Sequence, residues 1–200
     1  LMKKILNYSI LTGIFLFPFI GFIVPNSMFF PFISGKGFAF RIIIEIIFGL
    51  WVILAFADTQ YRPKLSWITK AVLFFIVSIF IADLLSANPY KSFWSNFERM
   101  EGFVLIAHLV MYYFVASTVL IGQNWNRLFN TTILASALMS FYGLFQLFGW
   151  ATINQGGVRV DATFGNSTYL AIYLVFHIFL CLFMIFREAR ANWQKWIYGS

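Results

Sequence analysis

Charged side chains are scarce in this 200-residue sequence. Aspartate, glutamate, lysine and arginine make up 10% of the residues, whereas soluble domains contain about 25%. Hydrophobic residues account for 61% and aromatic residues for 22%. So few charges cannot cover the surface of a soluble core of this size, which excludes a soluble enzyme, a disordered chain and a disulfide scaffold. A lipid bilayer is the solvent that tolerates this composition.

Several motifs of soluble enzymes are also missing. The sequence contains no Walker phosphate loop, dinucleotide fingerprint, HExxH motif, Cys/His cluster or Asp-x-Asp pair. The single cysteine, Cys181, lies inside an apolar run and can form no internal disulfide. We therefore expect neither a metal ion nor a cofactor in this segment.

Six long apolar runs predict transmembrane helices, because a helix that spans a bilayer needs about 20 mostly apolar residues. Strands of a membrane barrel would instead be about 10 residues long with alternating polarity. We therefore predict an all-α, polytopic membrane protein in which residues 1–200 form one helical domain. Asp83 at the end of the third run makes that span short. The predicted spans are residues 5–24, 38–57, 71–85, 103–121, 128–148 and 168–186.

The first run follows Lys3 and Lys4, as the apolar region of a signal peptide would. No small-x-small cleavage site follows it, and Pro25 comes next instead. We interpret the run as an uncleaved span, and the whole sequence as the N-terminal part of a longer chain.

The basic residues fit a membrane topology better than nucleic-acid binding, so the net charge of +7 does not predict a nucleic-acid partner. With a cytoplasmic N-terminus, most bases fall inside: Lys3, Lys4, Arg62, Lys64, Lys70, Arg127, Arg187, Arg190 and Lys195. The bases left on the outer side are Lys36, Arg41, Lys91, Arg99 and Arg159. Most acidic residues also fall on the outer side, and such mixed charges are typical of a polar working site.

Three outer-side arginines lie near the starts of helices predicted to run from outside to inside. Arg41 opens the second span, Arg99 precedes the fourth, and Arg159 precedes the sixth. Helix N-termini offer free N–H groups and the positive end of the helix dipole. Because arginine binds phosphate in a bidentate manner, these elements predict a diphosphate site.

Residues 95–98 match a capping box and predict a short helix with Arg99 in its first turn. A cation there opposes the helix dipole and needs an anionic partner. That partner is either Glu98 or Glu101, or the phosphate of a ligand. Glu101 therefore joins the three arginines as a candidate substrate-binding residue.

The other two arginines also have alternative interpretations. Arg41 and Glu45 share a helix face at i, i+4, either as an ion pair or as a ligand clamp inside the membrane. Arg159 either pairs with Asp161 at the surface or recognises phosphate. Either Asn166 or Ser167 is expected to cap the sixth span.

Two stretches of the sequence resemble bacterial O-antigen ligases and O-antigen polymerase-like proteins. Residues 88–102, NPYKSFWSNFERMEG, resemble the outer-loop signature of that family. Residues 159–171, RVDATFGNSTYLA, resemble its R-x-x-(G/A)-T-x-G-N-x-x-Y-L-A stretch, with Ser167 where proline often follows the asparagine. The segment from Pro31 through Arg41 and Glu45 also fits the early part of such chains.

The resemblance implies a metal-independent glycosyltransferase of the bacterial cytoplasmic membrane. Such an enzyme moves a glycan from a polyprenyl-diphosphate lipid to lipid A–core, a growing polysaccharide or a protein, on the outer membrane face. Arg99 and Arg159 would hold the diphosphate. The base would be a histidine in an outer loop beyond residue 200. Neither His108 nor His177 matches it, and each is expected to form interhelical hydrogen bonds.

Two other classes remain open. A transporter or flippase for an anionic lipid or solute would show repeats and broken helices near the midplane, and the sequence shows no repeat. A membrane scaffold without catalytic activity would not need arginines at three helix starts.

Overall fold

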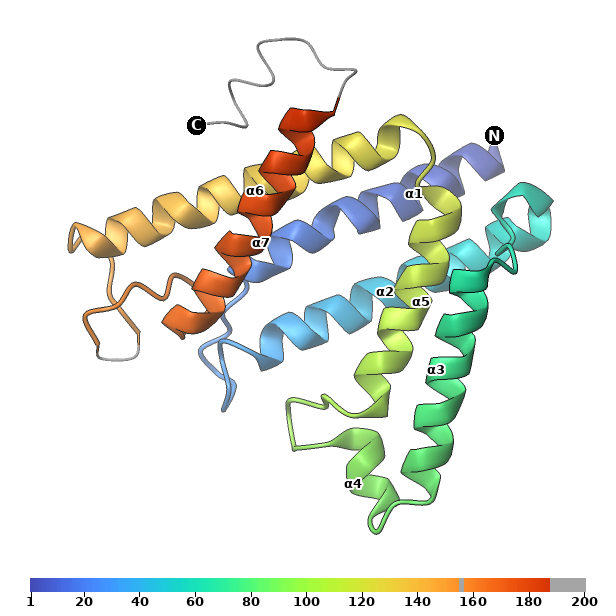
Figure 1. Cartoon of the computed structure of the whole chain (residues 1–200), viewed down its shortest axis with the longest axis horizontal. Coiled ribbons are helices and arrows are strands. Elements are labelled where there is room, and N and C mark those ends of the chain that lie inside the picture. The colour runs from blue at the N-terminus through green and yellow to red at the C-terminus, as the bar shows by residue number, and fades with distance from the viewer. Residues whose placement is uncertain (155–156, 188–200) are drawn as a thin grey trace. The chain divides into compact units, whose positions relative to one another are not determined.

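The computed structural model describes residues 1–154 and 157–187, which form helices and loops with no strand among them (Figure 1). Its elements are α1 (Met2–Leu16), η1 (Phe17–Phe22, a 3₁₀ helix), α2 (Ser34–Ala57), η2 (Thr59–Tyr61, a 3₁₀ turn), α3 (Trp67–Leu84), α4 (Pro89–Trp94), α5 (Phe103–Val119), α6 (Gln123–Leu147) and α7 (Ser167–Phe186). Large apolar side chains stay exposed along the helices, as lipid-facing surfaces require: Phe74 is 76% exposed and Phe179 66%.

The prediction of an all-α, polytopic membrane protein is confirmed. Within the described residues, five helical stretches are long and apolar enough to cross a membrane. The short apolar helix is α5, with 17 residues, and not α3, which was predicted to be short. Helix α3 begins earlier than predicted because the Ser66 hydroxyl accepts a hydrogen bond from the Thr69 N–H at 3.2 Å.

The chain divides into two compact units, where the sequence predicts a single domain. Unit 1 comprises Leu1–Ile20 and Val24–Gly122, and unit 2 comprises Gly21–Ile23 and the chain from Gln123 onward. Each unit has buried apolar residues of its own. Those of unit 1 include Ile10, Ile14, Ile44, Leu54 and Val115.

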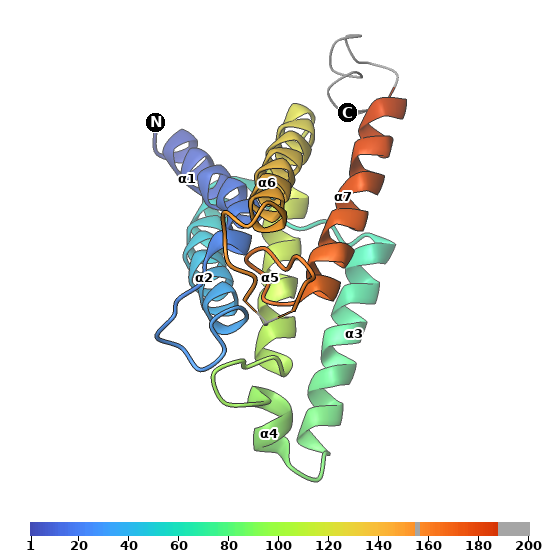
Figure 2. The same ribbon diagram turned by 90° about the vertical axis from the view of Figure 1, so that its left-hand side faces the viewer.

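Unit 1 is a packed set of helices in which α2 contacts α1 and α5, and α5 also contacts α3 (Figures 1 and 2). Helix α4 lies at the end of the α3–α5 pair. Gly13 of α1 allows a close approach to α2, because a Cβ atom there would lie 2.3 Å from Ile47 Cγ2. Small residues serve this purpose in membrane helix pairs.

Polar contacts join neighbouring segments at the two ends of unit 1. Lys3 Nζ donates to Asp58 Oδ2 at 3.0 Å, and this bond is the main reason why the pKa of Asp58 lies below its ordinary value. At the other end, the Phe29 N–H donates to Glu98 at 3.0 Å. Each contact joins segments that the sequence predicts on the same side of the membrane. Arg190 and Lys195, which also entered that prediction, lie outside the described residues.

Unit 2 consists of α6, α7, the loop between them and a short piece of the chain before α2. Its core is formed by Met139, Ala162 and Leu170. The Thr163 hydroxyl donates to the Gly21 carbonyl oxygen at 2.7 Å and ties the loop to residues 21–23. Of the two residues predicted to cap the last helix, Asn166 forms the cap, because its Oδ1 accepts from the Thr168 N–H at 2.8 Å.

Candidate functional site

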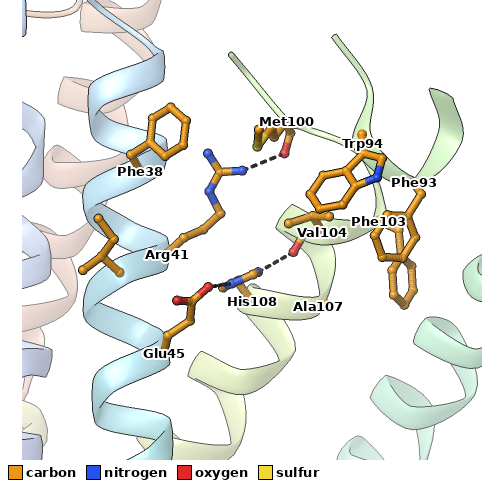
Figure 3. A pocket seen from close by; sticks show the side chains of 11 residues that line it. Phe38, Arg41, Glu45, Phe93, Trp94, Met100, Phe103, Val104, Ala107 and His108 are labelled. Atoms are coloured by element: carbon orange, nitrogen blue, oxygen red, sulfur yellow. Dashed lines mark hydrogen bonds and ion pairs between the residues drawn. The ribbon is translucent and has the colours of Figure 1, made fainter. Parts of the chain in front are cut away.

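A cavity of about 380 Å³ lies in unit 1 between α2 and α5, next to the end of α4 (Figure 3). Most of its wall is aromatic or aliphatic, and its polar side chains come from α2 and α5. Its lining residues are Phe38, Arg41, Ile42, Glu45, Phe93, Trp94, Met100, Phe103, Val104, Ala107 and His108. Another hollow of about 290 Å³ between α3 and α5 is lined by Ile76, Val77, Phe80 and Phe103 alone. The larger cavity therefore combines an apolar wall with polar chemistry, as ligand sites do.

Arg41 is the buried cation of this cavity, with 5% of its surface exposed. It lies about two turns inside α2, so the prediction that it opens the span is wrong and the helix dipole, which acts on the first turn, does not reach it. Its Nε donates to the Gly37 carbonyl oxygen at 3.2 Å, and its Nη1 to the Met100 carbonyl oxygen at 3.3 Å. Its Nη2 is buried and has no partner within the described chain. A buried donor without an acceptor is costly, and an anionic ligand would satisfy it.

Glu45 does not pair with Arg41, so the predicted i, i+4 ion pair is wrong. Its Oε1 lies 2.9 Å from His108 Nε2, across the α2–α5 interface (Figure 3). His108 Nδ1 lies 2.6 Å from the Val104 carbonyl oxygen of its own helix. The prediction of an interhelical hydrogen bond is thus confirmed for His108. For His177, Nδ1 lies 2.6 Å from a carbonyl oxygen of its own helix, and Nε2 has no partner among the described residues.

The predicted capping box at residues 95–98 does not form. Helix α4 comes first, with Asn88 Oδ1 accepting from the Lys91 N–H at 3.0 Å and with a proline in its first turn. Ser95 follows α4 with φ 61°, and Glu98 and Met100 have φ 65° and 50°. Three non-glycine residues in the left-handed region make this loop strained, and such backbone persists only where its surroundings hold it.

Glu98 holds the strained loop in place. Its carboxylate accepts hydrogen bonds from the Phe29 and Phe30 N–H groups, both at 3.0 Å, and from the Ser34 hydroxyl at 3.3 Å. These partners precede or begin α2, so one side chain joins the 95–100 loop to the start of the helix that carries Arg41. The Glu98 carboxylate is thus bonded to a distant segment and is not available for the predicted capping box.

Arg99 lies on this loop and not in the first turn of a helix, which corrects the prediction. Its guanidinium stacks over the Phe30 ring at 4.2 Å, and its buried Nε has no partner among the described residues. The predicted carboxylate partners do not compensate it: Glu98 is engaged elsewhere and Glu101 is exposed. A Cβ atom at Gly37 would lie 3.8 Å from Arg41 Nη2 and 4.0 Å from the Arg99 carbonyl oxygen. The Arg41 guanidinium and the Arg99 backbone therefore border the same glycine.

Glu98 also makes the loop sensitive to acid. The hydrogen bond from Phe29 is the main factor that lowers the pKa of Glu98 below its ordinary 4.5; burial opposes it, and the bonds from Phe30 and Ser34 add to it. A group with a lowered pKa stabilises the fold above its unfolded-state pKa and loses this contribution as the pH falls through the folded-state value. The melting temperature of detergent-solubilised protein is therefore expected to fall from about pH 4.5 downward, and less steeply in Glu98→Gln. Glu101→Gln, which alters an exposed carboxylate, is the control, and equal acid profiles in all three proteins would contradict the assignment.

Arg159 lies in unit 2 and is exposed, and the structure gives its side chain no partner within the described residues. The predicted surface ion pair with Asp161 is wrong, because Asp161 is buried with 1% exposure. Asp161 Oδ1 accepts from Gln146 Nε2 at 2.8 Å, and Oδ2 accepts from the Asn154 N–H at 3.1 Å. Gln146 and Asn154 were not predicted, and the only signal in the sequence is a polar glutamine near the end of an apolar run.

The structure thus assigns the candidate residues to two places. Arg41, Arg99 and Glu101 belong to unit 1, and Arg159 belongs to unit 2. A single site made by all three arginines stays a prediction. Within the described part of the chain, no three histidine, cysteine, aspartate or glutamate side chains are grouped to hold a metal ion. Comparison with protein-family models, curated proteins and solved structures gave no match.

Proposed function

We propose that this chain is part of a membrane glycosyltransferase of the O-antigen ligase or polymerase type. It transfers a glycan from a polyprenyl-diphosphate donor to an acceptor on the outer face of the bacterial cytoplasmic membrane. The observation that carries this proposal is the guanidinium of Arg41, which is buried on the wall of an aromatic cavity and whose Nη2 has no partner in the part of the chain that the structure describes. Charges inside apolar helices are costly and mark functional sites.

The chemistry of the cavity fits the head of a lipid-linked diphosphate. A diphosphate offers several oxygens to a guanidinium fork, and charge-assisted bonds of this kind are among the strongest in proteins. Phe93, Trp94 and Phe103 provide apolar surface beside the cation for a prenyl chain or a sugar face. The backbone of Arg99 borders Gly37 beside Arg41, and its guanidinium, which lies over Phe30, is a further candidate cation.

Two of the sequence stretches that resemble the O-antigen ligase family supply this cavity. The stretch from Pro31 to Glu45 provides Phe38, Arg41 and Glu45, and residues 88–102 provide Phe93, Trp94 and Met100. The sequence resemblance and the cavity therefore support the same proposal. In the reaction, breaking the bond between sugar and diphosphate leaves negative charge on the diphosphate, and pre-placed arginines stabilise that charge. A base on another part of the protein activates the acceptor hydroxyl.

The alternative is a transporter or flippase for an anionic lipid, and one observation favours it. Glu45 and His108 form a titratable pair inside the helices, and such pairs occur in the proton relays of transporters. The two functions differ in outcome, since a transferase breaks the bond between sugar and diphosphate and a transporter delivers the lipid unchanged.

The test is a bacterial strain that lacks its own copy of the protein and carries variants of it. Arg41→Ala, Arg99→Ala and Arg159→Ala are expected to abolish glycan attachment while membrane insertion is normal. Purified Arg41→Ala should bind undecaprenyl diphosphate roughly 10- to 100-fold more weakly, because one charge-assisted hydrogen bond contributes about 1.5–3 kcal/mol. Arg41→Lys and Arg159→Lys should also be impaired, because lysine lacks the planar fork.

Arg127→Ala is the matched control, because Arg127 is an exposed arginine predicted on the other side of the membrane. It is expected to behave like the wild type. Normal glycan attachment in all three alanine variants would defeat the transferase proposal. Transport of a labelled, glycan-bearing lipid diphosphate across the bilayer of vesicles that contain the protein, with the glycan still attached, would support the transporter instead.

A further inference from the structure

Glu45 and His108 form a dyad that faces the cavity of unit 1 (Figure 3). Glu45 Oε1 lies 2.9 Å from His108 Nε2, while Oε2 makes no hydrogen bond within the described residues. The Glu45 side chain is 61% exposed, and the His108 side chain only 10%. One oxygen of the Glu45 carboxylate is therefore open to a ligand, while the buried His108 contacts the other oxygen.

The geometry fixes how many protons the Glu45–His108 dyad holds. The Val104 carbonyl oxygen can only accept, so His108 Nδ1 at 2.6 Å must carry a hydrogen. The contact between Nε2 and Oε1 then needs one more proton, because two lone pairs repel each other. That proton sits either on His108 as an imidazolium or on Glu45 as a carboxylic acid, and in both cases the dyad is neutral. Losing it makes the dyad −1, and gaining another makes it +1.

Few other titratable groups act on the dyad. Among the described residues, Arg41, one turn away on α2, is the only other titratable residue that lines the cavity. Tyr112, one turn along α5, packs against Phe17 and Phe40.

On α3, Lys70 and Asp83 lie near the two helix ends. On α1, the titratable residues Lys3, Lys4 and Tyr8 lie in the first two turns, at the end where Lys3 meets Asp58. The α4 side contributes only apolar residues to the cavity, with Glu98 bonded to the segment before α2 and the Arg99 guanidinium over Phe30.

We infer that the Glu45–His108 dyad takes up a proton when an anion binds beside Arg41, so that the cavity binds its ligand and a proton together. An anion next to Arg41 also lies near the Glu45 carboxylate, and a negative dyad would repel it. At a pH at which part of the protein has lost this proton, the anion shifts the dyad back toward its neutral, protonated state. This inference rests on the proposed function for the identity of the anion, a lipid-linked diphosphate.

The experiment measures binding and proton uptake together by isothermal titration calorimetry. The chain is placed in nanodiscs and titrated with undecaprenyl diphosphate, or with inorganic pyrophosphate, in buffers of different ionisation enthalpy between pH 5.5 and 8.5. The variants are Glu45→Gln, which keeps a hydrogen bond to His108 Nε2 without the exchangeable proton, and His108→Gln. The matched control is His177→Gln, since His177 has the same contact of Nδ1 with a carbonyl of its own helix but no carboxylate partner among residues 1–154 and 157–187.

In the wild type and in His177→Gln, we expect an affinity that falls by up to about tenfold per pH unit as the dyad loses its proton. Glu45→Gln and His108→Gln should still bind at the acid end of the range, with less proton uptake and a flatter slope. Any protonation change of the diphosphate itself is common to all four proteins and cancels in the comparison.

The outcomes separate this inference from the proposed function. Binding of undecaprenyl diphosphate with a slope that depends on Glu45 supports both. Binding of inorganic pyrophosphate alone, with the same dependence on Glu45, supports proton uptake and contradicts the lipid-linked donor. Lipid binding with equal slopes in wild type and Glu45→Gln overturns the inference and leaves the proposed function standing. Binding of neither probe overturns both.

Discussion

Alanine in place of Gly102 is expected to destabilise unit 1 by roughly 3 kcal/mol, at the upper end of the cost of overpacking. A Cβ atom there would lie 2.3 Å from the Ser92 carbonyl oxygen and 2.6 Å from the Phe93 carbonyl oxygen. Both atoms belong to the backbone of α4, so no side-chain rotation can relieve the clash. The φ of Gly102 is −78°, which any residue adopts, and the expected effect is therefore steric alone.

The same substitution should also weaken ligand binding, because α4 must move away from the start of α5. Phe93 and Trp94, at the end of α4, line the cavity and would move with it. Thermal unfolding in detergent and binding of undecaprenyl diphosphate measure the two effects. Gly49→Ala is the control, because a Cβ atom at this helical glycine meets nothing within 4 Å and alanine favours the helix. Equal stability of Gly102→Ala and wild type would show that α4 is not packed on α5 as described.

Most of the fold follows from the sequence because membrane helices depend on local composition. Each of the six apolar runs became a helix, since a chain in lipid must satisfy its backbone groups within the segment. The boundaries depend on single residues and were harder to predict. Ser66 starts α3 before its apolar run, and the Asn88 cap starts α4 where the sequence predicts only a loop.

The site was harder to predict than the fold because its polar pairs join distant parts of the chain. The i, i+4 spacing of Arg41 and Glu45 suggested a local pair, yet Glu45 bonds to His108, a residue 63 positions away in the sequence. Glu98 matched a capping box, yet its partners Phe29 and Phe30 lie before α2. Local spacing identifies residues that need a partner, and tertiary packing decides which partner they obtain.

Removing the Asp161 carboxylate is expected to be the most damaging change in unit 2. Three N–H donors point at this carboxylate: Gln146 Nε2 at 2.8 Å, the Asn154 backbone N–H at 3.1 Å and Asn154 Nδ2 at 3.2 Å. Alanine would leave the Asn154 backbone N–H without this acceptor. Gln146 Nε2 and Asn154 Nδ2 would keep one acceptor each, the Thr152 and Ala162 carbonyl oxygens, beside a core residue, Ala162, that holds a φ of 46°. Of the two donor residues, Gln146 is buried and Asn154 is exposed. Because an unsatisfied buried donor costs about 1–3 kcal/mol, Asp161→Ala should lose roughly 2–3 kcal/mol.

Asp161→Asn keeps the volume of the side chain but removes one of its two acceptor oxygens. An asparagine keeps one oxygen, but its NH₂ group faces a donor of Asn154, so an intermediate loss of stability is expected. Arg159→Ala is the matched control from the same loop, and its exposed side chain should contribute nothing to thermal stability in detergent. If Asp161→Ala melted like Arg159→Ala, the buried network would not hold the loop. If the melting temperature falls from wild type to Asp161→Asn and further to Asp161→Ala, then Asp161 sets the backbone conformation of the loop that carries Arg159. Loss of Asp161 should then impair glycan attachment as strongly as loss of Arg159 itself.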